Sequence, residues 1–237
     1  MNLLAKKELN LKIIDIISNL SIELQIKTFV VGGYVRDLLL ERKTDDIDIL
    51  VIGDGISFAR KVKKKLSSNV SLQIFKNFGT AMISYDGYEV QFVGSRKESY
   101  QKSSRNPIVD GGTFEDDISR RDFTINSIAI SLNKENKGKI IDLFGGIHDL
   151  KKGIIKTPQD PKITFYDDPL RMMRAVRFAA QLNFKIKKSN IETIKSEKER
   201  INIISMERIH DELNKILLSP KPSIGFILLR DTGLLEI

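Results

Sequence analysis

The stretch that decides the fold runs from residue 30 to residue 50 and reads VVGGYVRDLLLERKTDDIDIL. It predicts a buried strand that ends at Gly32-Gly33, a helix that begins directly after the glycines, and a second strand rich in β-branched residues. Outward from this unit, residues 9–24 have the apolar spacing of a helix. Residues 71–94 predict three strands, the last two joined by Asp86-Gly87, a strong two-residue hairpin signal.

The same stretch groups residues that suit phosphate chemistry. Side chains two apart on a strand share a face, so Asp46 and Asp48 project together and repel each other unless a cation lies between them. Oxygen-only donors favour Mg²⁺ bound together with substrate phosphates. Gly32-Gly33 lets backbone amides approach a phosphate closely, and Arg36 could bind a triphosphate oxygen. A solvated acidic strand end is the structural alternative, and the complete stretch favours the nucleotide site.

Composition restricts the remaining possibilities. Lys and Arg number 39 against 31 Asp and Glu in 237 residues, a net charge of +8 that favours phosphate-bearing partners. The absence of cysteine excludes disulfides, zinc–thiolate sites and cysteine nucleophiles, and two histidines exclude a multi-histidine metal site. Apolar runs are too short for a membrane span, and the first residues lack the core of a signal peptide. We therefore expect a cytoplasmic protein without a membrane partner.

The pattern along the chain predicts an α+β fold. Residues 1–160 are expected to form a mixed sheet with flanking helices, and residues 161–237 an all-helical domain. Within the first of these regions, the stretch 95–118 is polar and lacks periodicity. It is expected to be a long loop that acts as a functional lid or is disordered.

The 30–50 stretch resembles the first motif of the bacterial-type (class II) CCA-adding enzyme and poly(A) polymerase family of nucleotidyltransferases. Further segments in the same order resemble the later motifs of that family. They are SRRDFTINSIAI at 119–130, IDLFGGIHDLKKGIIKT at 141–157, YDDPLRMMRAVRFAAQLNF at 166–184, and ERIHDELNKILLSPKPSIGFILLRDTGLLEI at 207–237. The resemblance implies a nucleotidyltransferase head (palm) domain over 1–160 and a helical neck domain over 161–237, incomplete at its C-terminal end.

The resemblance also implies a role for individual residues. Metal ligation and catalysis would fall to Asp46 and Asp48, and contacts with the nucleotide to Gly33, Arg36, Arg121, Asp168, Arg171, Arg174 and Arg177. Within that set Asp168 and Arg171 match the pair that hydrogen-bonds the base edge and acts as an amino-acid template. Asp122 matches a residue that orients Arg121 or the sugar.

The spacing of the last four residues supports this assignment. Asp168, Arg171, Arg174 and Arg177 recur every three residues, so each would neighbour the next on a helix. Arginines crowded in this way repel each other without an anion, and a carboxylate with a guanidinium can complement a base edge. The alternative is a salt-bridged helix surface.

The implied function is template-independent addition of C-C-A to tRNA 3′ ends from CTP and ATP, with Mg²⁺ as cofactor and release of pyrophosphate. Poly(A) polymerase, an A-only or C-only enzyme, and a non-catalytic RNA-binding fragment stay open as alternatives. Glu89 is a third metal carboxylate or an ordinary cross-strand residue, and Arg105 helps to switch the nucleotide or is a solvated loop arginine. The sequence leaves the oligomeric state and protein partners open.

Overall fold

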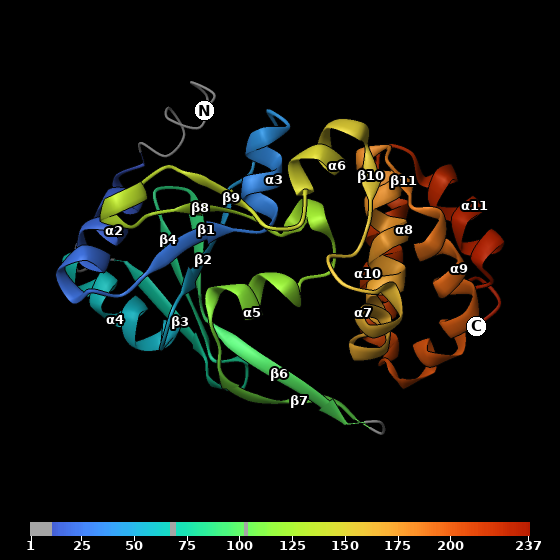
Figure 1. The fold of residues 1–237 in the computed structure, drawn as a ribbon, viewed down its shortest axis with the longest axis horizontal. Helices are drawn as coiled ribbons and strands as arrows, with labels where there is room; N and C mark the ends of the chain where they lie inside the picture. Colours follow the sequence, from blue (N-terminus) through green and yellow to red (C-terminus); the bar gives the residue numbers. More distant parts are fainter. Residues whose placement is uncertain (1–10, 67–69, 102–103) are drawn as a thin grey trace. The chain divides into compact units, whose positions relative to one another are not determined.

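The computed structural model describes residues 11–66, 70–101 and 104–237, and these divide into two compact units (Figure 1). Unit 1 draws its described residues from Met1–Lys97, Val109–Ile118 and Asn126–Leu143; unit 2 draws its own from Glu98–Ile108, Ser119–Ile125 and Phe144–Ile237. The two units are interleaved along the chain. The domain division at residues 160 and 161 stays a prediction.

A mixed seven-stranded sheet forms the centre of unit 1, with strand order β3-β4-β5-β2-β1-β8-β9. β2 and β5 are parallel, and the other neighbouring strands are antiparallel. The strands are β1 (Thr28–Val31), β2 (Asp46–Val51), β3 (Ser71–Phe75), β4 (Thr80–Tyr85), β5 (Tyr88–Gly94), β8 (Ile128–Ser131) and β9 (Ile140–Asp142). The helices of this part of the chain are α2 (Lys12–Leu24), α3 (Gly33–Leu39), α4 (Gly55–Lys65) and α5 (Phe114–Ser119), with the short 3₁₀ turns η1 (Lys76–Phe78), η2 (Thr124–Asn126) and η3 (Lys134–Asn136).

Alternation along the strands separates an apolar face of the sheet from a polar one. Ile47 and Ile49 of β2 are fully buried, and Phe92 of β5 packs against Phe58 of α4 with ring centroids 6.2 Å apart. The strand, helix and second strand predicted from residues 30–50 are confirmed, as are the three strands between 71 and 94. The Asp86-Gly87 turn has positive φ at both residues, which fits a two-residue hairpin.

The structure differs from the prediction over residues 95–118. β6 (Arg96–Gln101) and β7 (Ser104–Gly111) form a two-stranded sheet here, and α5 follows, where the sequence predicted a loop. A two-stranded ribbon is held by backbone hydrogen bonds and need not bury one face, so it lacks the apolar alternation by which strands are recognised. Arg105 lies on β7, and the lid function of this segment stays a prediction.

Unit 2 is mainly helical. Besides the parts of β6 and β7 that lie within Glu98–Ile108, its elements from Phe144 onward are α6 (Gly146–Lys152), β10 (Ile154–Ile155), α7 (Pro161–Asp167), α8 (Leu170–Leu182), β11 (Lys185–Ile186), α9 (Lys188–Glu197), η4 (Lys198–Ile203), α10 (Met206–Leu217) and α11 (Pro222–Thr232). β10 and β11 are two short strands that pair in parallel over two residues, and the other elements from Phe144 onward are helical. Within residues 11–66, 70–101 and 104–237, no helix has both the length and the apolar character that a membrane crossing requires.

Helix α8 is the centre of unit 2 and packs against α10 and α11. Phe178 of α8 meets Phe123 edge to face, with ring centroids 5.8 Å apart. Gly225 of α11 lies so close to Ile216 of α10 that a Cβ atom would overlap the isoleucine side chain. A buried ion pair between Arg177 of α8 and Glu212 of α10 joins the two helices at 2.6 Å.

The first prediction concerns the close approach of two backbone segments in unit 1. A Cβ atom on Gly94 would lie 2.5 Å from the carbonyl oxygen of Gly53, which no backbone shift relieves cheaply. Gly94→Ala should therefore lower the free energy of unfolding by about 1–3 kcal/mol, measured by urea titration. Gly111→Ala is the control, because nothing lies within 4 Å of its Cβ position. Equal stability of the two variants would contradict the packing argument.

The second prediction concerns the ion pair of unit 2. Glu212 is 3% exposed, so Glu212→Gln leaves the buried guanidinium of Arg177 without its counter-charge. The free energy of unfolding should fall by about 3 kcal/mol. Glu207→Gln, on the exposed first turn of the same helix, should change it by at most about 0.5 kcal/mol. Equal free energies of unfolding for the Glu212 and Glu207 variants would show that the Arg177–Glu212 ion pair does not stabilise the fold.

Candidate functional site

Strand β2 presents Asp46 and Asp48 on one face of the sheet of unit 1. Asp46 is exposed at the start of the strand, and Asp48 is half-buried. The parallel register sets Glu89 of β5 opposite Asp46 and Gln91 opposite Asp48, so these residues share the face. In the part of the chain that the structure describes, no three His, Cys, Asp or Glu side chains form a group able to hold a metal ion. Glu89 is thus a register neighbour of the pair and not part of a three-carboxylate cluster.

The start of α3 lies beside the same end of β2. Val31, the last residue of β1, is opposite Asp48, and the chain continues through Gly32 into the first turn of α3. Gly32 has φ 76°, a conformation that glycine adopts without strain. The backbone pairing of β1 with β2 therefore places the start of α3 two residues beyond the position opposite Asp48.

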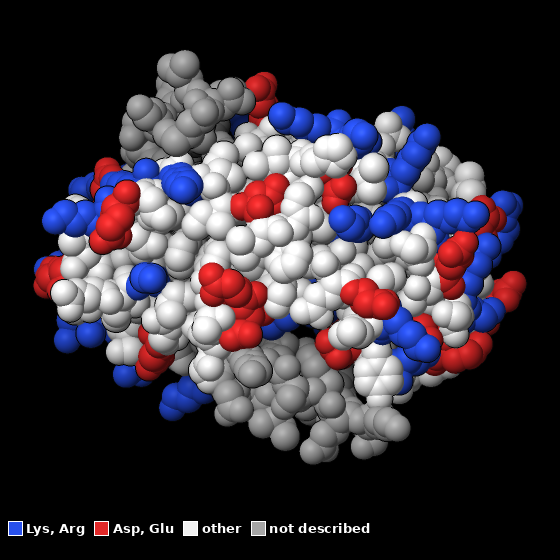
Figure 2. Space-filling model, viewed as in Figure 1, with Lys and Arg blue, Asp and Glu red and all other residues white. Residues whose placement is uncertain are grey.

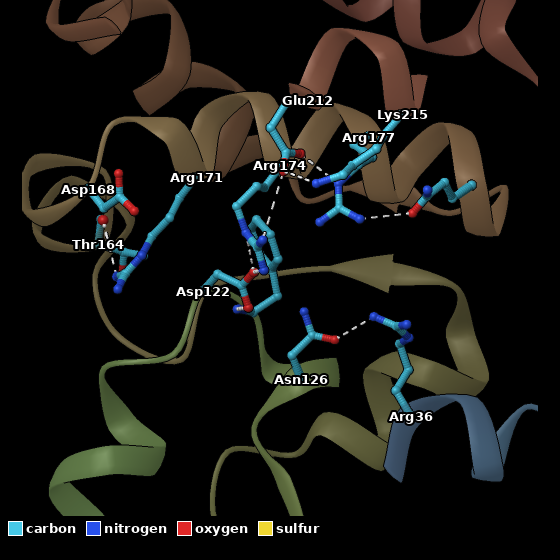
Figure 3. Close-up of polar contacts among 12 residues, drawn as sticks. Arg36, Asp122, Asn126, Thr164, Asp168, Arg171, Arg174, Arg177, Glu212 and Lys215 are labelled. Atoms are coloured by element: carbon cyan, nitrogen blue, oxygen red, sulfur yellow. Dashed lines mark hydrogen bonds and ion pairs between the residues drawn. The ribbon is translucent and has the colours of Figure 1, made fainter. Parts of the chain in front are cut away.

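Arg36 is held in place within unit 1. Its side chain donates from Nη1 to Oδ1 of Asn126 at 2.8 Å (Figure 3). It also donates from Nη2 to Oδ2 of Asp37 at 2.6 Å. The residue is 9% exposed, and a Cβ atom on Gly33 would lie 3.6 Å from its Nη2. The guanidinium is therefore fixed next to the first turn of α3.

In unit 2, Asp122 binds Arg174 through two hydrogen bonds that converge on one carboxylate oxygen. Nε and Nη2 of Arg174 donate to Oδ2 of Asp122 at 2.9 and 2.5 Å, and the other carboxylate oxygen accepts from the amide of Phe123 (Figure 3). Burial alone would lower the pKa of Arg174, but the charge and hydrogen bonds of Asp122 outweigh it and raise the pKa above the usual value. The pair fixes the plane of the Arg174 guanidinium.

Arg177 is one turn further along α8 and is held by Glu212. Its Nε donates to Oε2 of Glu212 at 2.6 Å, and its Nη1 donates to Gln181 at 3.1 Å. The guanidinium lies 4.1 Å from the centroid of the Phe178 ring. Burial lowers the pKa of Arg177, Glu212 offsets this in part, and the charge of Arg174 lowers it further. One buried carboxylate therefore compensates two crowded arginines, as Glu212 also lies 4.0 Å from Arg174.

Asp168 precedes α8 rather than lying on it, which corrects the prediction that all four residues share a helix face. Its Oδ1 accepts from the amide of Leu170 at 3.2 Å and so caps the helix start, while its Oδ2 lies 3.4 Å from Nη2 of Arg208. The side chain of Arg171 donates to the carbonyl of Thr164 at 3.4 Å. The reason is Pro169, because a proline disfavours the helical conformation of the residue before it. Asp168 is accordingly extended, with φ −139° and ψ 100°, and the helix begins after it.

The predicted residues thus form two sets. Unit 1 contains Gly33, Arg36, Asp46 and Asp48, and unit 2 contains Arg121, Asp168, Arg171, Arg174 and Arg177. Glu212, Arg208 and Asn126 contact these residues but were missed by the sequence reasoning. Their partners are 35, 40 and 90 positions away, and no local pattern reports pairs at such separations.

The donor set on β2 fits a hard divalent cation. Both groups are carboxylates, neither is deeply buried, and the face that they share also carries the polar Gln91. Two carboxylates with substrate oxygens and water match the way in which Mg²⁺ is bound at phosphate sites.

Comparison with known families gives two matches. Residues 28–156 match the model of the poly A polymerase head domain, and residues 183–237 match that of the probable RNA and SrmB-binding site of polymerase A.

Similar proteins include the CCA-adding enzyme of Lactobacillus helveticus, 38% identical over 89% of this chain and 51% of that protein. The A-adding tRNA nucleotidyltransferase of Aquifex aeolicus is 38% identical over 75% of this chain and 21% of that protein. Among solved structures, a CCA-adding enzyme in apo form II superposes with a TM-score of 0.84 at 33% identity, covering 94% of this chain and 52% of that one. A tRNA nucleotidyltransferase complexed with a primer tRNA and an incoming ATP analog gives 0.81 at 31% identity, over 93% and 61%.

The chain spans about half the length, or less, of the relatives described above. Its head-domain match nevertheless covers more than half of its own residues and includes the complete β1–α3–β2 unit with both aspartates. The chain therefore belongs to the poly(A) polymerase and CCA-adding enzyme family of nucleotidyltransferases.

Proposed function

We propose that the chain is the catalytic part of a template-independent RNA nucleotidyltransferase that completes tRNA 3′ ends with C-C-A from CTP and ATP. The observation that carries the proposal is the pair Asp46 and Asp48 on one face of β2, with the first turn of α3 beside them. Similarity to CCA-adding enzymes and to a structure titled as a complex with primer tRNA supports the choice of substrate.

In this proposal unit 1 holds the reacting phosphates. Asp46 and Asp48 bind Mg²⁺, which when bound activates the RNA 3′-hydroxyl and neutralises charge on the triphosphate. The hydroxyl oxygen attacks the α-phosphorus in line, and the bond to pyrophosphate breaks. Arg36, fixed by Asp37 and Asn126, adds positive charge where the triphosphate approaches α3. The protein contributes mainly orientation and charge, as expected for transfer at phosphorus.

Unit 2 supplies recognition of the base. Asp168 accepts a hydrogen bond from the exocyclic amino group that cytosine and adenine both carry, and Arg171 donates to a ring nitrogen or carbonyl. Arg174 and Arg177 are oriented in advance by Asp122 and Glu212, so little side-chain entropy is lost when a nucleotide binds. Arg121, directly before Asp122 in the chain, contributes a further cationic contact.

A second candidate is addition of the terminal A alone. The observation in its favour is the similarity to the A-adding tRNA nucleotidyltransferases of Aquifex aeolicus and Geobacter sulfurreducens, at 38% and 37% identity.

One experiment separates these functions. The chain is incubated with Mg²⁺ and with tRNAs that end before C-C-A or after C-C, with CTP and ATP given separately and together, and the product ends are sequenced. Sequential C, C and A supports the proposal, and A added only after C-C supports the second candidate. A long A tract identifies a poly(A) polymerase, and binding without any incorporation identifies an RNA-binding module.

The third prediction tests the carboxylate pair. Asp48→Asn should reduce nucleotide incorporation by about a thousandfold at saturating Mg²⁺, because the neutral amide cannot replace the charged metal ligand. Asp86→Asn is the control, since this exposed turn residue undergoes the same change of charge and asparagine tolerates its positive φ. Urea unfolding should be the same for both variants. If Asp48→Asn turns over at the wild-type rate, Asp48 is not a metal ligand of the active site.

The fourth prediction tests base selection. Asp168→Asn keeps an oxygen that can cap α8, but its amide group also offers donors to the carbonyl of uracil. The ratio of kcat/KM for CTP to that for UTP should fall by about tenfold or more. Asp160→Asn, at the cap of α7, makes the same replacement away from the base-binding residues and should leave the ratio unchanged. An unaltered ratio of kcat/KM for CTP to that for UTP in Asp168→Asn would show that Asp168 does not select the base and has only a structural role.

A further inference from the structure

The turn between α7 and α8 carries Asp168, and the hydrogen bonds made by Asp168 itself are long. Its amide donates to the carbonyl of Thr164 at 3.5 Å. Its carboxylate accepts from the amide of Leu170 at 3.2 Å and lies 3.4 Å from Nη2 of Arg208. Ordinary N–H···O hydrogen bonds have a length of about 2.9 Å. The position of the carboxylate therefore depends on whatever else fixes the backbone of this turn.

Arg200 of η4 binds the residue two positions before Asp168. Its Nη2 donates to the carbonyl oxygen of Tyr166 at 2.9 Å, and its guanidinium carbon lies 3.9 Å from the centroid of the Tyr166 ring. One guanidinium thus contacts the backbone and the side chain of the same residue. Because η4 follows α9 directly and α9 packs against α7, these contacts attach the end of α7 to a neighbouring part of unit 2.

The Arg200 guanidinium is held over Tyr166 at the expense of another hydrogen bond. Its Nε is buried and has no hydrogen-bond partner among the residues that the structure describes. Burying a donor without a partner is unfavourable, so the contacts that keep the group in this position have to compensate for it. The electron-rich face of the Tyr166 ring attracts a cation at this distance, and the Tyr166 carbonyl accepts the remaining hydrogen bond.

The charge of an arginine suits this place. α7 has no basic residue in its last turn, and Asp167 and Asp168 follow each other where the helix ends. Carboxylates are unfavourable at the negative end of a helix dipole. The guanidinium at the Tyr166 carbonyl brings positive charge to this end from another element. Figure 2 shows acidic and basic side chains next to each other over the region where Figure 1 draws α7.

We propose that Arg200 is a positioning residue for base selection, because it fixes the turn that carries Asp168. The inference rests on the proposed function in that Asp168 is the residue that binds the base. In this role Arg200 does not contact the nucleotide and acts only through Tyr166. The alternative is that Arg200 attaches η4 to α7 and contributes to stability alone, and the two roles differ in what a substitution changes.

The first measurement follows the turn itself, without nucleotide or RNA. In Arg200→Gln the amides of Asp168, Leu170 and Arg171 should exchange hydrogen about tenfold faster, because the backbone that carries them is no longer attached to η4. Exchange in the interior of α8 and of α10 should stay at the wild-type rate. The individual amides are resolved by NMR.

The second measurement is base selection. The ratio of kcat/KM for CTP to that for UTP should fall about fivefold in Arg200→Gln. The fall should be smaller in Arg200→Lys, because lysine keeps the charge but cannot lie flat on the ring while it donates to the carbonyl. Tyr166→Leu should lower the ratio as Arg200→Gln does. Tyr166→Phe keeps the aromatic ring and should leave the ratio unchanged.

Coupling to Asp168 separates positioning from stability. If Arg200 acts through Asp168, the double variant with Asp168→Asn and Arg200→Gln should have the same nucleotide ratio as Asp168→Asn alone. Loss of stability would instead lower kcat/KM for CTP and UTP alike. Urea unfolding of every variant defines conditions in which the protein is folded. The matched control is Arg230→Gln, an exposed arginine on α11 whose partner is the adjacent Asp231, and it should change neither the exchange nor the ratio.

Each result has a defined meaning. Wild-type exchange at the turn in Arg200→Gln, or an unaltered ratio of CTP to UTP while incorporation continues, overturns the proposal and leaves the proposed function standing. A further fall of the ratio in the double variant also overturns it, because Arg200 would then act by another route than Asp168.

Failure of the proposed function is recognised separately. If the wild type incorporates no nucleotide under any condition, the proposed function fails, and the ratio of Kd for UTP to Kd for CTP, measured without RNA, replaces the kinetic ratio. A fall of this binding ratio in Arg200→Gln supports the role of Arg200 in base selection. An unchanged binding ratio overturns it.

Discussion

The buried carboxylate of Glu212 is the constraint on which the arrangement of the arginines of unit 2 depends. Arg174 and Arg177 are one turn apart on α8, and their charges would drive them apart in the absence of an anion. Glu212 approaches both, at 4.0 and 2.6 Å, and Asp122 compensates Arg174 from the other side. Because guanidinium groups bind carboxylates in a fixed plane, the compensation also determines where the remaining N–H groups point. The same contacts that hold α8 to α10 therefore fix the orientation of both guanidinium groups.

Unit 1 reaches a comparable arrangement through backbone pairing. The antiparallel register of β1 and β2 sets the first turn of α3 beside Asp48, and the parallel register of β2 and β5 sets Glu89 beside Asp46. A shift of one residue would turn both aspartates into the core, where Ile47 and Ile49 now lie. The position of the two aspartates on one face of β2 therefore depends on the apolar packing of the isoleucines on the opposite face.

The limits of sequence reasoning follow from the range of each interaction. Local periodicity and turn signals were enough to predict the β1–α3–β2 unit, the Asp86-Gly87 hairpin and the grouping of arginines on α8. The two-stranded ribbon of β6 and β7 was not predicted. Its strands pair with each other through backbone hydrogen bonds and do not require the apolar alternation that marks a strand in the sequence. Asp168 was assigned to a helix from its three-residue spacing alone, although Pro169 disfavours the helical conformation of the residue before it. The partners of Arg36 and Arg177, which are Asn126 and Glu212, were not predicted because only the folded chain brings these distant residues together.

The order of strands in unit 1 has a consequence for the synthesis of the chain. β1 lies between β2 and β8, and its register with β8 pairs Phe29 with Ser131. A growing chain can form the β1–β2 and β2–β5 contacts once residue 94 has emerged, but the other edge of β1 has no partner until residues 128–131 follow. Every residue of β1 is buried in the folded protein, so until β8 follows the strand has an unpaired backbone edge beside apolar side chains. A chain that stalls between these points exposes a strand edge able to pair with other chains, which makes this interval of translation prone to aggregation.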